Sequence, residues 1–333
     1  MQPPPLTAPF HIGDVEIANR VLLAPLAGIG NWFVRLQARR HGAGLAVSEM
    51  VSSFGLHYRN ERTLRELLRL HPDEHPVSIQ LFGQDPEVMR SAAAIAAEAG
   101  AAIVDINMGC PVRKVCKTGS GAALLRDHAL AVELAIAARE GGGRPVTVKL
   151  RSGVEPGGRE GFELARRLVA EAGVAAIGFH PRSAATRHKG RPDYALAREL
   201  AEAIEAPMII SGGLDTAGAA RRAYELSGAD AVMIARGALG NPWIFEQLTG
   251  RRAEPPSREE MVVELLWVVD RAEEHLGPER AARYLRKFYP WYLERIGASK
   301  VDLAAFQASD DLADARRLVA ELAGDRAREP VAA

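Results

Sequence analysis

The sequence predicts a (β/α)₈ barrel, the TIM-barrel fold, followed by a small all-helical C-terminal domain. Eight short runs of apolar or β-branched residues alternate with longer amphipathic stretches between residues 20 and 237. The runs are apolar almost throughout, which is typical of parallel strands buried on both faces. Eight such units in one domain favour a closed barrel. An open dinucleotide-binding sheet is disfavoured because no G-x-G-x-x-G follows the first run.

The predicted strands and helices follow one another in a regular order. The strands cover residues 20–25, 45–50, 77–83, 102–109, 145–151, 175–180, 207–213 and 230–237. Helical patterns between them are clearest at 85–100, 126–142 and 216–228. Asp85 and Thr216 stand where helix N-caps belong, and glycines close several of the helical segments.

The pattern changes after residue 250. The segment RRAEPPSREE at 251–260 is typical of a linker that ends in a helix start at Ser257. From Glu259 to about Gly324 the sequence has helical periodicity and no strand signal. We therefore expect a barrel catalytic domain at 1–250, a helical domain at 251–325 and a disordered tail at 326–333.

The composition is that of an ordinary globular protein, and its charges balance. Basic and acidic residues number 42 each, so the formal net charge is zero and a nucleic-acid partner would have to bind a local basic patch. Cys110 and Cys116 are too few for a disulfide framework and lack the spacing of metal ligands. The sequence starts without a signal-peptide pattern and has no apolar run long enough to span a membrane. We expect a cytoplasmic monomer without a metal ion.

Polar and glycine residues follow almost every predicted strand, although the strand bodies are apolar. In a barrel of this type the active site lies at the carboxyl ends of the strands. These ends carry Pro25, Glu49, Gln80, Asn107 with Cys110, Lys149 with Arg151, His180, Ser211-Gly212-Gly213 and Ala235-Arg236-Gly237. The ordinary polarity of loops explains one or two such residues. A full ring is better explained by an active site.

The last two strand ends carry glycines at the positions where barrels bind phosphate. Ser211-Gly212-Gly213 and Arg236-Gly237 combine flexible backbone, free N–H groups and a cation. Either segment alone is also compatible with an ordinary tight turn. Together they favour a ligand or cofactor that bears a phosphate.

Lys149 and Gln80 extend the polar ring on neighbouring strands. Lys149 lies between Val148 and Leu150, and burying its ammonium group without a partner would be expensive, so it must reach a polar site or an anion. A bound flavin offers such a partner, because its reduced form carries negative charge on the pyrimidine edge. Gln80 could complement that edge by donating and accepting hydrogen bonds. A satisfied loop residue remains an alternative for Gln80.

His180 opens a loop rich in positive charge. The loop carries Arg182 and, further on, Arg187, His188, Lys189 and Arg191. A run of this kind is often a solvated face. At an active-site mouth it would instead hold a phosphate-rich substrate, and His180 would belong to the site rather than act only as a structural hydrogen-bonding group.

Cys110 follows the fourth predicted strand in a turn whose backbone is fixed by Gly109 and Pro111. An ordinary thiol has a pKa of about 8.5, so it is mostly protonated at neutral pH and can donate a proton. A cation that lowered its pKa would make it a nucleophile instead. Cys116 has no comparable position at a strand end, and we assign it a structural role.

Several motifs in order along the barrel resemble the tRNA-dihydrouridine synthases. They are APLAG (24–28), SEM (48–50), QLFG (80–83), DINMGCP (105–111), KTGSGAALL (117–125), VKLRSG (148–153), HPRS (180–183) and MIARGALGNPWIF (233–245). The resemblance implies a bound FMN that NADPH reduces, and reduction of the C5–C6 double bond of uridines in tRNA. Hydride would reach C6, and Cys110, carried over by its motif, would protonate C5.

The same resemblance implies which residues contact cofactor and substrate. For FMN these are Pro25, Leu26, Ala27, Gln80, Lys149, His180, Ser211, Gly212, Gly213, Ala235 and Arg236, the last five nearest the phosphate. Asn107 and Arg182 would contact the target uracil. A deep barrel mouth suits this chemistry, because the base must leave its stack to meet the cofactor.

The chain departs from the usual family pattern at four places. Leu26 replaces the methionine of APMAG, Ser211-Gly212-Gly213 replaces an Asn-Gly-Asp-like turn, and Ala235 replaces a glycine. The loop after the sixth predicted strand begins HPRSAATRHKG (180–190) where the family usually has H-G-R-T, although Arg182 is aligned with the arginine of that motif. These changes concern individual flavin contacts more than the chemistry.

The helical C-terminal domain is predicted to bind tRNA. Arg280, Arg283 and Lys287 recur at helical spacing, with Arg286 beside them. Such a basic face could neutralise phosphates. Tyr284, Phe288, Tyr289, Trp291 and Tyr292 are interleaved with the charges, and we expect Phe288 and Trp291 to belong to the core.

Two other functions fit parts of the pattern. A dehydrogenase of a free pyrimidine, similar to dihydroorotate dehydrogenase, would also use a loop cysteine and a lysine at a strand end. The basic helical segment and KTGSGAALL argue against it, because a small acid substrate needs neither. A non-catalytic RNA-binding barrel is disfavoured because Cys110, Lys149 and the phosphate-side glycines are all present.

Overall fold

The computed structural model describes residues 3–324, which form two compact units. The first contains residues 3–238 and 244–251, and the second contains 239–243 and 252–324. The predicted tail at 326–333 lies outside the described residues.

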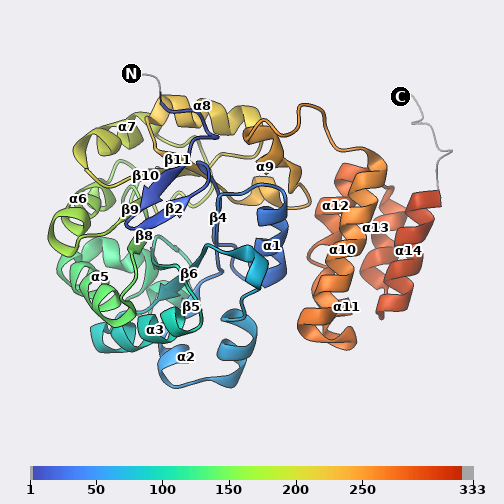
Figure 1. Ribbon diagram of the computed structural model, residues 1–333, viewed down its shortest axis with the longest axis horizontal. Coiled ribbons are helices and arrows are strands. Elements are labelled where there is room, and N and C mark those ends of the chain that lie inside the picture. The colour runs from blue at the N-terminus through green and yellow to red at the C-terminus, as the bar shows by residue number, and fades with distance from the viewer. Residues whose placement is uncertain (1–2, 325–333) are drawn as a thin grey trace. The chain divides into compact units, whose positions relative to one another are not determined.

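The first unit is a closed barrel of parallel strands, as predicted (Figure 1). Within the described chain its strands are β3 (Val21–Leu23), β4 (Leu45–Val47), β6 (Val77–Phe82), β7 (Ile103–Met108), β8 (Val146–Arg151), β9 (Ala176–His180), β10 (Met208–Ser211) and β11 (Ala231–Ile234). Each lies within its predicted run. The barrel closes because β3 pairs with β4 on one side and with β11 on the other, both in parallel.

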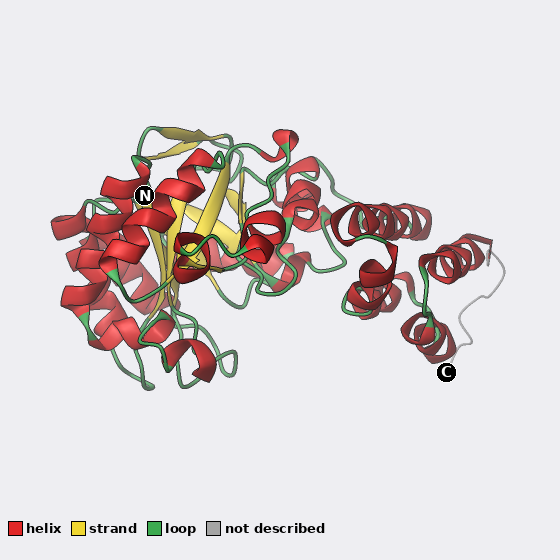
Figure 2. Ribbon diagram, turned by 90° about the horizontal axis from the view of Figure 1, so that it is seen from below, coloured by secondary structure: helices red, strands yellow, loops and turns green. Residues whose placement is uncertain are grey.

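Helices cover the outside of the strands (Figure 2). They are α1 (Trp32–Arg40), α3 (Pro86–Glu98), α5 (His128–Gly142), α6 (Glu160–Ala172), α7 (Tyr194–Ala203) and α8 (Ala217–Ser227). The expected caps are confirmed: Asp85 accepts from the N–H of Val88, and Thr216 accepts from that of Ala219. Left-handed glycines end α5, α6 and α8, where a side chain would strain the backbone.

A hairpin that sequence reasoning missed packs against the barrel core. Its strands, β1 (Phe10–Ile12) and β2 (Val15–Ile17), are antiparallel. Ile12 and Ile17 are fully buried in one apolar cluster with residues from the amino ends of barrel strands, among them Leu45 and Ile103. The hairpin thereby closes the amino end of the barrel, which leaves the carboxyl ends of the strands for a site.

Shorter elements lie between the barrel strands or directly after the last of them. They are β5 (Val51–Ser52), α2 (Ser53–His57), the π-helix η1 (Thr63–Leu67), the 3₁₀ helix η2 (Pro72–Glu74), α4 (Arg113–Cys116), the 3₁₀ helices η3 (Gly121–Arg126) and η4 (Arg236–Ala238), and α9 (Trp243–Leu248). A fully buried ion pair between Arg35 and Glu74, 2.6 Å apart, ties η2 to α1. No local sequence pattern predicts this ion pair.

The second unit is helical, as predicted. It contains α10 (Arg258–Leu276), α11 (Pro278–Leu285), α12 (Tyr289–Ile296), α13 (Lys300–Ala308) and α14 (Leu312–Gly324). Ser257 caps α10 with a reciprocal pair of hydrogen bonds to Glu260, at the predicted helix start. No helix in residues 3–324 is long and apolar enough to cross a membrane.

Candidate active site at the carboxyl end of the barrel

Three neighbouring strands bring a row of polar side chains together inside the barrel. In the register of β6, β7 and β8, Gln80 lies beside Asp105, Asp105 beside Thr147, and Asn107 beside Lys149. Gln80 is fully buried and Asp105 is 4% exposed. Gln80, Asp105, Thr147 and Asn107 hydrogen-bond to one another, so these four form a connected network rather than a set of separate polar residues.

The network runs from Asp105 toward the turn that carries Cys110. The two carboxylate oxygens of Asp105 accept from Gln80 Nε2 at 2.6 Å and from Thr147 Oγ1 at 2.5 Å. Gln80 Oε1 accepts from Asn107 Nδ2 at 2.9 Å. Asn107 Oδ1 accepts from the main-chain N–H of Cys110 at 2.9 Å and from that of Gly109 at 3.2 Å.

Cys110 lies half-buried directly after β7. Burial raises the pKa of its thiol above the ordinary value, and the opposing influence of nearby Arg151 and Lys149 is smaller. The thiol is therefore protonated at neutral pH, which suits a proton donor better than a nucleophile. The carbonyl oxygen of Cys110 accepts from Cys116 Sγ at 3.2 Å and from the N–H of Ala122 at 3.0 Å. Cys116 thus supports the turn, and both cysteines are free thiols.

Arg151 joins the Cys110 turn to the loop that follows β9. It is 3% exposed, and its guanidinium donates to the carbonyl oxygens of Gly109, Ser183 and Arg187 at 2.7–3.1 Å. Burial lowers the pKa of Arg151 to about 10, so it stays charged at neutral pH. The loop is therefore held over the same side of the barrel as the thiol.

His180 and Arg182 form a buried pair at the start of that loop. Arg182 donates from one guanidinium nitrogen to His180 Nε2 at 3.1 Å, and from the other two to the carbonyl oxygen of Gly190. Burial, followed by the charges of Lys149 and Arg151, lowers the pKa of His180 far below its ordinary value. His180 is therefore a neutral acceptor at Nε2.

The predicted phosphate turns have backbone that favours glycine. Gly212 and Gly213 have φ angles of +95° and +76°. A Cβ at Gly212 would lie 2.3 Å from His180 Nε2, and one at Gly237 would lie 2.4 Å from the carbonyl oxygen of Leu214. Only glycine fits these places without movement, so the backbone is left open to a close ligand.

Positive charge converges on these turns. Lys149 Nζ donates to Ser211 Oγ at 3.2 Å. Burial, and secondly Arg151, lower the pKa of Lys149 to about 8. Arg236 is exposed at the start of η4, next to the half-buried Ala235. Burial, and to a smaller extent the charge of Arg236, lower the pKa values of Arg182 and His188. The carboxyl ends of β8 to β11 therefore form a cationic cradle.

The loop after β3 completes the ring of strand ends around the mouth of the barrel. Pro25 is half-buried, Leu26 is 8% exposed and Ala27 is exposed. The N–H of Gly28 donates to Glu49 Oε2 at 2.7 Å, which joins this loop to the end of β4. The structure thus places the predicted residues of β3, β6–β11 and their loops at one end of one barrel.

Sequence reasoning missed Asp105 and Thr147, because it considered the ends of strands and not their bodies. A signal was present: polar residues recur at every second position in DIN (105–107) and TVK (147–149), the spacing of one strand face. Ser48 was also missed; its Oγ accepts from the N–H of Gln80 at 2.9 Å.

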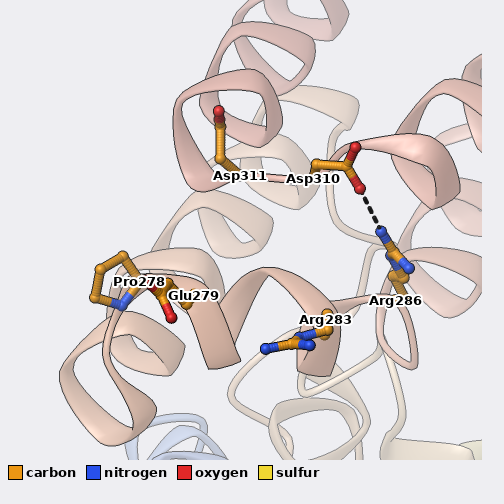
Figure 3. A pocket seen from close by; sticks show the side chains of 6 residues that line it. All are labelled: Pro278, Glu279, Arg283, Arg286, Asp310 and Asp311. Carbon is orange, nitrogen blue, oxygen red and sulfur yellow. Dashed lines mark hydrogen bonds and ion pairs between the residues drawn. The ribbon is translucent and has the colours of Figure 1, made fainter.

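The helical unit holds a separate polar cleft of about 410 Å³ (Figure 3). Its lining residues are Pro278, Glu279, Arg283, Arg286, Asp310 and Asp311. The predicted basic face is only partly correct, because α11 ends at Leu285 and Lys287 lies beyond it. Arg286 donates to the Ser309 carbonyl oxygen and to Asp310, at 3.1 and 3.2 Å, and so holds the α13–α14 connection.

The aromatic residues of this segment are mainly core. Phe288 is 3% exposed, as expected, and Tyr289 and Tyr292 are buried as well. Trp291 is half-buried and packs edge-on against Phe288 with ring centroids 5.5 Å apart. Lys287 Nζ lies 4.8 Å from the centroid of the Tyr284 ring.

Comparison with known proteins agrees with the resemblance seen in the sequence. The family model described as dihydrouridine synthase matches residues 22–324. The tRNA-dihydrouridine synthase B of Pseudomonas aeruginosa is 37% identical over 311 residues, covering 90% of this chain and 92% of that protein. The protein of the same name from Pseudomonas putida is 35% identical and covers 90% of each chain.

Solved structures of lower identity share the barrel fold. A variant of NCR from Zymomonas mobilis has a TM-score of 0.56 at 20% identity, covering 78% of this chain and 95% of that one. Morphinone reductase in complex with tetrahydroNAD has a TM-score of 0.52 at 18% identity, covering 78% and 94%. At these identities the likeness concerns the fold alone. The family match and the curated relatives together establish that this chain belongs to the dihydrouridine synthase family.

Proposed function

We propose that this protein is a tRNA-dihydrouridine synthase, which reduces the C5–C6 double bond of uridines in tRNA with bound FMN and NADPH. The observation that carries the proposal is the half-buried Cys110 thiol, held directly after the carboxyl end of β7 beside a cationic cradle. Membership of the family supplies the reaction class, and the relatives' names supply tRNA as the substrate.

The residues present fit FMN. Gly212 and Gly213 expose backbone in a cradle that a Cβ would fill, and Arg236 adds a positive charge there for the phosphate. Gln80 and Lys149 suit the polar edge of the ring system, because one offers amide groups and the other an ammonium group. Pro25, Leu26, Ala27, His180, Ser211 and Ala235 complete the proposed contacts. When bound, the flavin supplies hydride to C6 of the base.

The chain's own residues perform the proton transfer. Cys110 Sγ donates its proton to C5, and the burial that raises its pKa keeps that proton in place until the base is bound. Asn107 holds the turn through its carbonyl oxygen, and Arg182 presents a guanidinium group next to His180. We assign Asn107 and Arg182 to the recognition of the uracil, which must leave its stack to enter the barrel.

Cys110→Ala tests the proposal when the two half-reactions are measured separately by anaerobic stopped flow. The variant should keep its flavin and be reduced by NADPH at the wild-type rate. Reoxidation by tRNA should slow by about 10²–10⁴-fold, the usual effect of losing one positioned general acid.

Cys116→Ala is the matched control for this experiment. Because Cys116 only supports the turn, its variant should reoxidise much faster than Cys110→Ala. Loss of flavin reduction in Cys110→Ala would contradict the assigned role. A wild-type protein that binds no flavin would contradict the proposed function as a whole.

A further inference from the structure

The buried chain of side chains between Asp105 and Cys110 has a fixed hydrogen-bond direction. At one end, the main-chain N–H groups of Gly109 and Cys110 can only donate, so Asn107 must turn its carbonyl oxygen toward them. The amide nitrogen of Asn107 then faces Gln80 and requires the oxygen of Gln80 there. The side-chain amides of Asn107 and Gln80 are thus each oriented by the group next to them.

Asp105 lies at the other end of this row of side chains, where the amide nitrogen of Gln80 requires a hydrogen-bond acceptor. With its oxygen toward Asn107, Gln80 directs Nε2 at residue 105, 2.6 Å from a carboxylate oxygen. The second carboxylate oxygen takes the hydroxyl proton of Thr147. Both oxygens of a 4% exposed carboxylate are therefore used by donors from neighbouring strands, and a buried unpaired polar group is costly.

We propose that Asp105 is a positioning residue that sets the direction of the Gln80 and Asn107 amides, and thereby holds the Cys110 turn in its working geometry. Asp105 is separated from Cys110 by two side chains, so it acts through them and not on the substrate. The proposal deepens the proposed function and rests on it, because it assigns a supporting residue to the same acid.

The structure predicts what happens when the acceptor is lost. In Asp105→Leu, Gln80 Nε2 faces an apolar group, so Gln80 no longer has a reason to keep its oxygen toward Asn107. The Asn107 amide is then free to turn, and the N–H groups of Gly109 and Cys110 lose their acceptor. The thiol should become more exposed, and its pKa should fall toward the ordinary value.

Asp105→Asn and Thr147→Val are the matched variants. Asparagine can turn its oxygen to Gln80 and its amide nitrogen to the hydroxyl oxygen of Thr147, which can rotate and accept, so the chain keeps its direction. Thr147→Val removes the other hydrogen bond of Asp105 but leaves the bond to Gln80 intact. Both variants should leave the turn in place.

The experiment measures alkylation of Cys110 by iodoacetamide as a function of pH in the flavin-loaded proteins, by tryptic peptide mapping. Cleavage at Arg113 and Lys114 separates Cys110 from Cys116, so alkylation of the two thiols is scored separately. At neutral pH the alkylation rate of Cys110 should rise by up to about tenfold for each unit by which its pKa falls in Asp105→Leu, because the thiolate fraction rises while each thiolate becomes somewhat less nucleophilic. It should stay close to wild type in Asp105→Asn and Thr147→Val.

A second measurement links the turn to catalysis. In Asp105→Leu the reoxidation of reduced flavin by tRNA should slow, and Asp105→Asn should restore it. If Asp105→Leu fails to fold, Asp105→Ala removes the same acceptor without adding bulk, and it is used in both measurements instead.

The inference is overturned if alkylation of Cys110 is unchanged when the acceptor is removed, or if Asp105→Asn behaves like Asp105→Leu. The second outcome would assign the effect to the charge of Asp105. Alkylation does not depend on the reaction with tRNA, so this failure is distinct from a failure of the proposed function. That function would fall if the wild-type protein did not reduce uridine.

Discussion

Buried Asp105 and half-buried Lys149 lie near each other inside the barrel, and the loss of water around each charge moves both pKa values toward neutrality. The pKa of Asp105 rises to about 6 and that of Lys149 falls to about 8, each mainly because the charged form loses water. Each residue opposes the other's shift, since its charge stabilises that of its partner. Between about pH 6 and pH 8 Asp105 is negative and Lys149 is positive. Below about pH 6 Asp105 becomes neutral, and above about pH 8 Lys149 becomes neutral.

The first prediction concerns Lys149 and follows from this pKa. The ordinary lysine value is 10.5, so a folded-state pKa of about 8 means that the ammonium group loses its proton as the pH rises through 8. The affinity for FMN should therefore be constant below this pH. Above it the affinity should fall, by at most about tenfold per pH unit for one proton. Fluorescence titration of the apoprotein between pH 6.5 and 9.5 (a range of about three units) measures this.

Lys149→Gln provides the comparison, because glutamine cannot titrate. Its affinity should be lower than that of the wild type at neutral pH and should show no inflection near 8. An inflection of equal size in the FMN affinity of both proteins would show that Lys149 is not part of the flavin site.

The second prediction separates backbone strain from steric conflict at Gly212. Gly212→Ala places a Cβ 2.3 Å from His180 Nε2 on a backbone with φ of +95°. Gly157→Ala imposes a similar positive φ, +81°, with no atom within 4 Å of the new Cβ. The control should lose about 1–2 kcal/mol of unfolding free energy.

Gly212→Ala should lose more unfolding free energy than the control, because His180 must also move, and it alone should lose FMN affinity. Urea denaturation and flavin titration measure the two effects. Equal losses of stability together with wild-type FMN affinity would show that the Gly212 turn is not part of the cradle.

At the scale of elements, the sequence predicted strands and helices better than it predicted their connections. Every barrel strand lies inside its predicted run, because an apolar run between helical patterns has few other structures to adopt. The β1–β2 hairpin was missed because it is only three residues per strand. The end of α11 at Leu285 was missed as well, since the basic spacing continued past it.

The candidate site was predictable where its residues end a strand and hidden where they lie within one. Lys149 and Cys110 were found because a polar residue after an apolar run is conspicuous. Asp105 and Thr147 were not, because their roles depend on a strand pairing that only the register of β7 with β8 reveals. The cation–carbonyl contacts of Arg151 depend on loop conformation, which no local pattern specifies.

The third prediction concerns the start of α10. Ser257 accepts from the N–H of Glu260, and the Glu260 carboxylate accepts from the N–H of Ser257. Ser257→Ala removes one of these bonds and should destabilise the helical unit by about 1 kcal/mol. Ser257→Asp keeps an acceptor at the same place and adds a favourable charge at the helix N-terminus, so it should be close to wild type.

Hydrogen exchange of the first turn of α10 checks this prediction, with the barrel helices as the reference. Protection should fall in Ser257→Ala near residues 258–261 and be unchanged in the barrel. Equal protection in the alanine and aspartate variants would mean that the cap contributes nothing to α10.

At the scale of the whole molecule, a chain of zero net charge must bind a polyanion through local clusters of positive charge. The barrel concentrates Lys149, Arg151, Arg182 and Arg236 at one end, although most of these are engaged with loop carbonyls or with the proposed cofactor site. The helical unit is the remaining candidate for contacts to phosphates. Within it, Arg283 is exposed at the border of the cleft, whereas Arg286 is bonded to Ser309 and Asp310.

The last prediction therefore places a phosphate contact at Arg283. If its guanidinium meets a phosphate of tRNA, Arg283→Gln should weaken tRNA binding and lower the slope of log affinity against log salt by about 1. The catalytic residues are untouched, so NADPH should still reduce the flavin at the wild-type rate. Filter binding at a series of KCl concentrations gives the slope.

Arg317→Gln is the matched control, because it makes the same change in net charge within the same unit. Arg317 is paired with Glu321 at 2.7 Å and with Asp314 at 3.4 Å, so its charge is already balanced by neighbouring carboxylates. Its variant should keep the wild-type salt slope. A slope that falls equally in both variants would indicate a general effect of charge. A slope unchanged in Arg283→Gln would mean that the helical unit binds tRNA, if at all, through another surface.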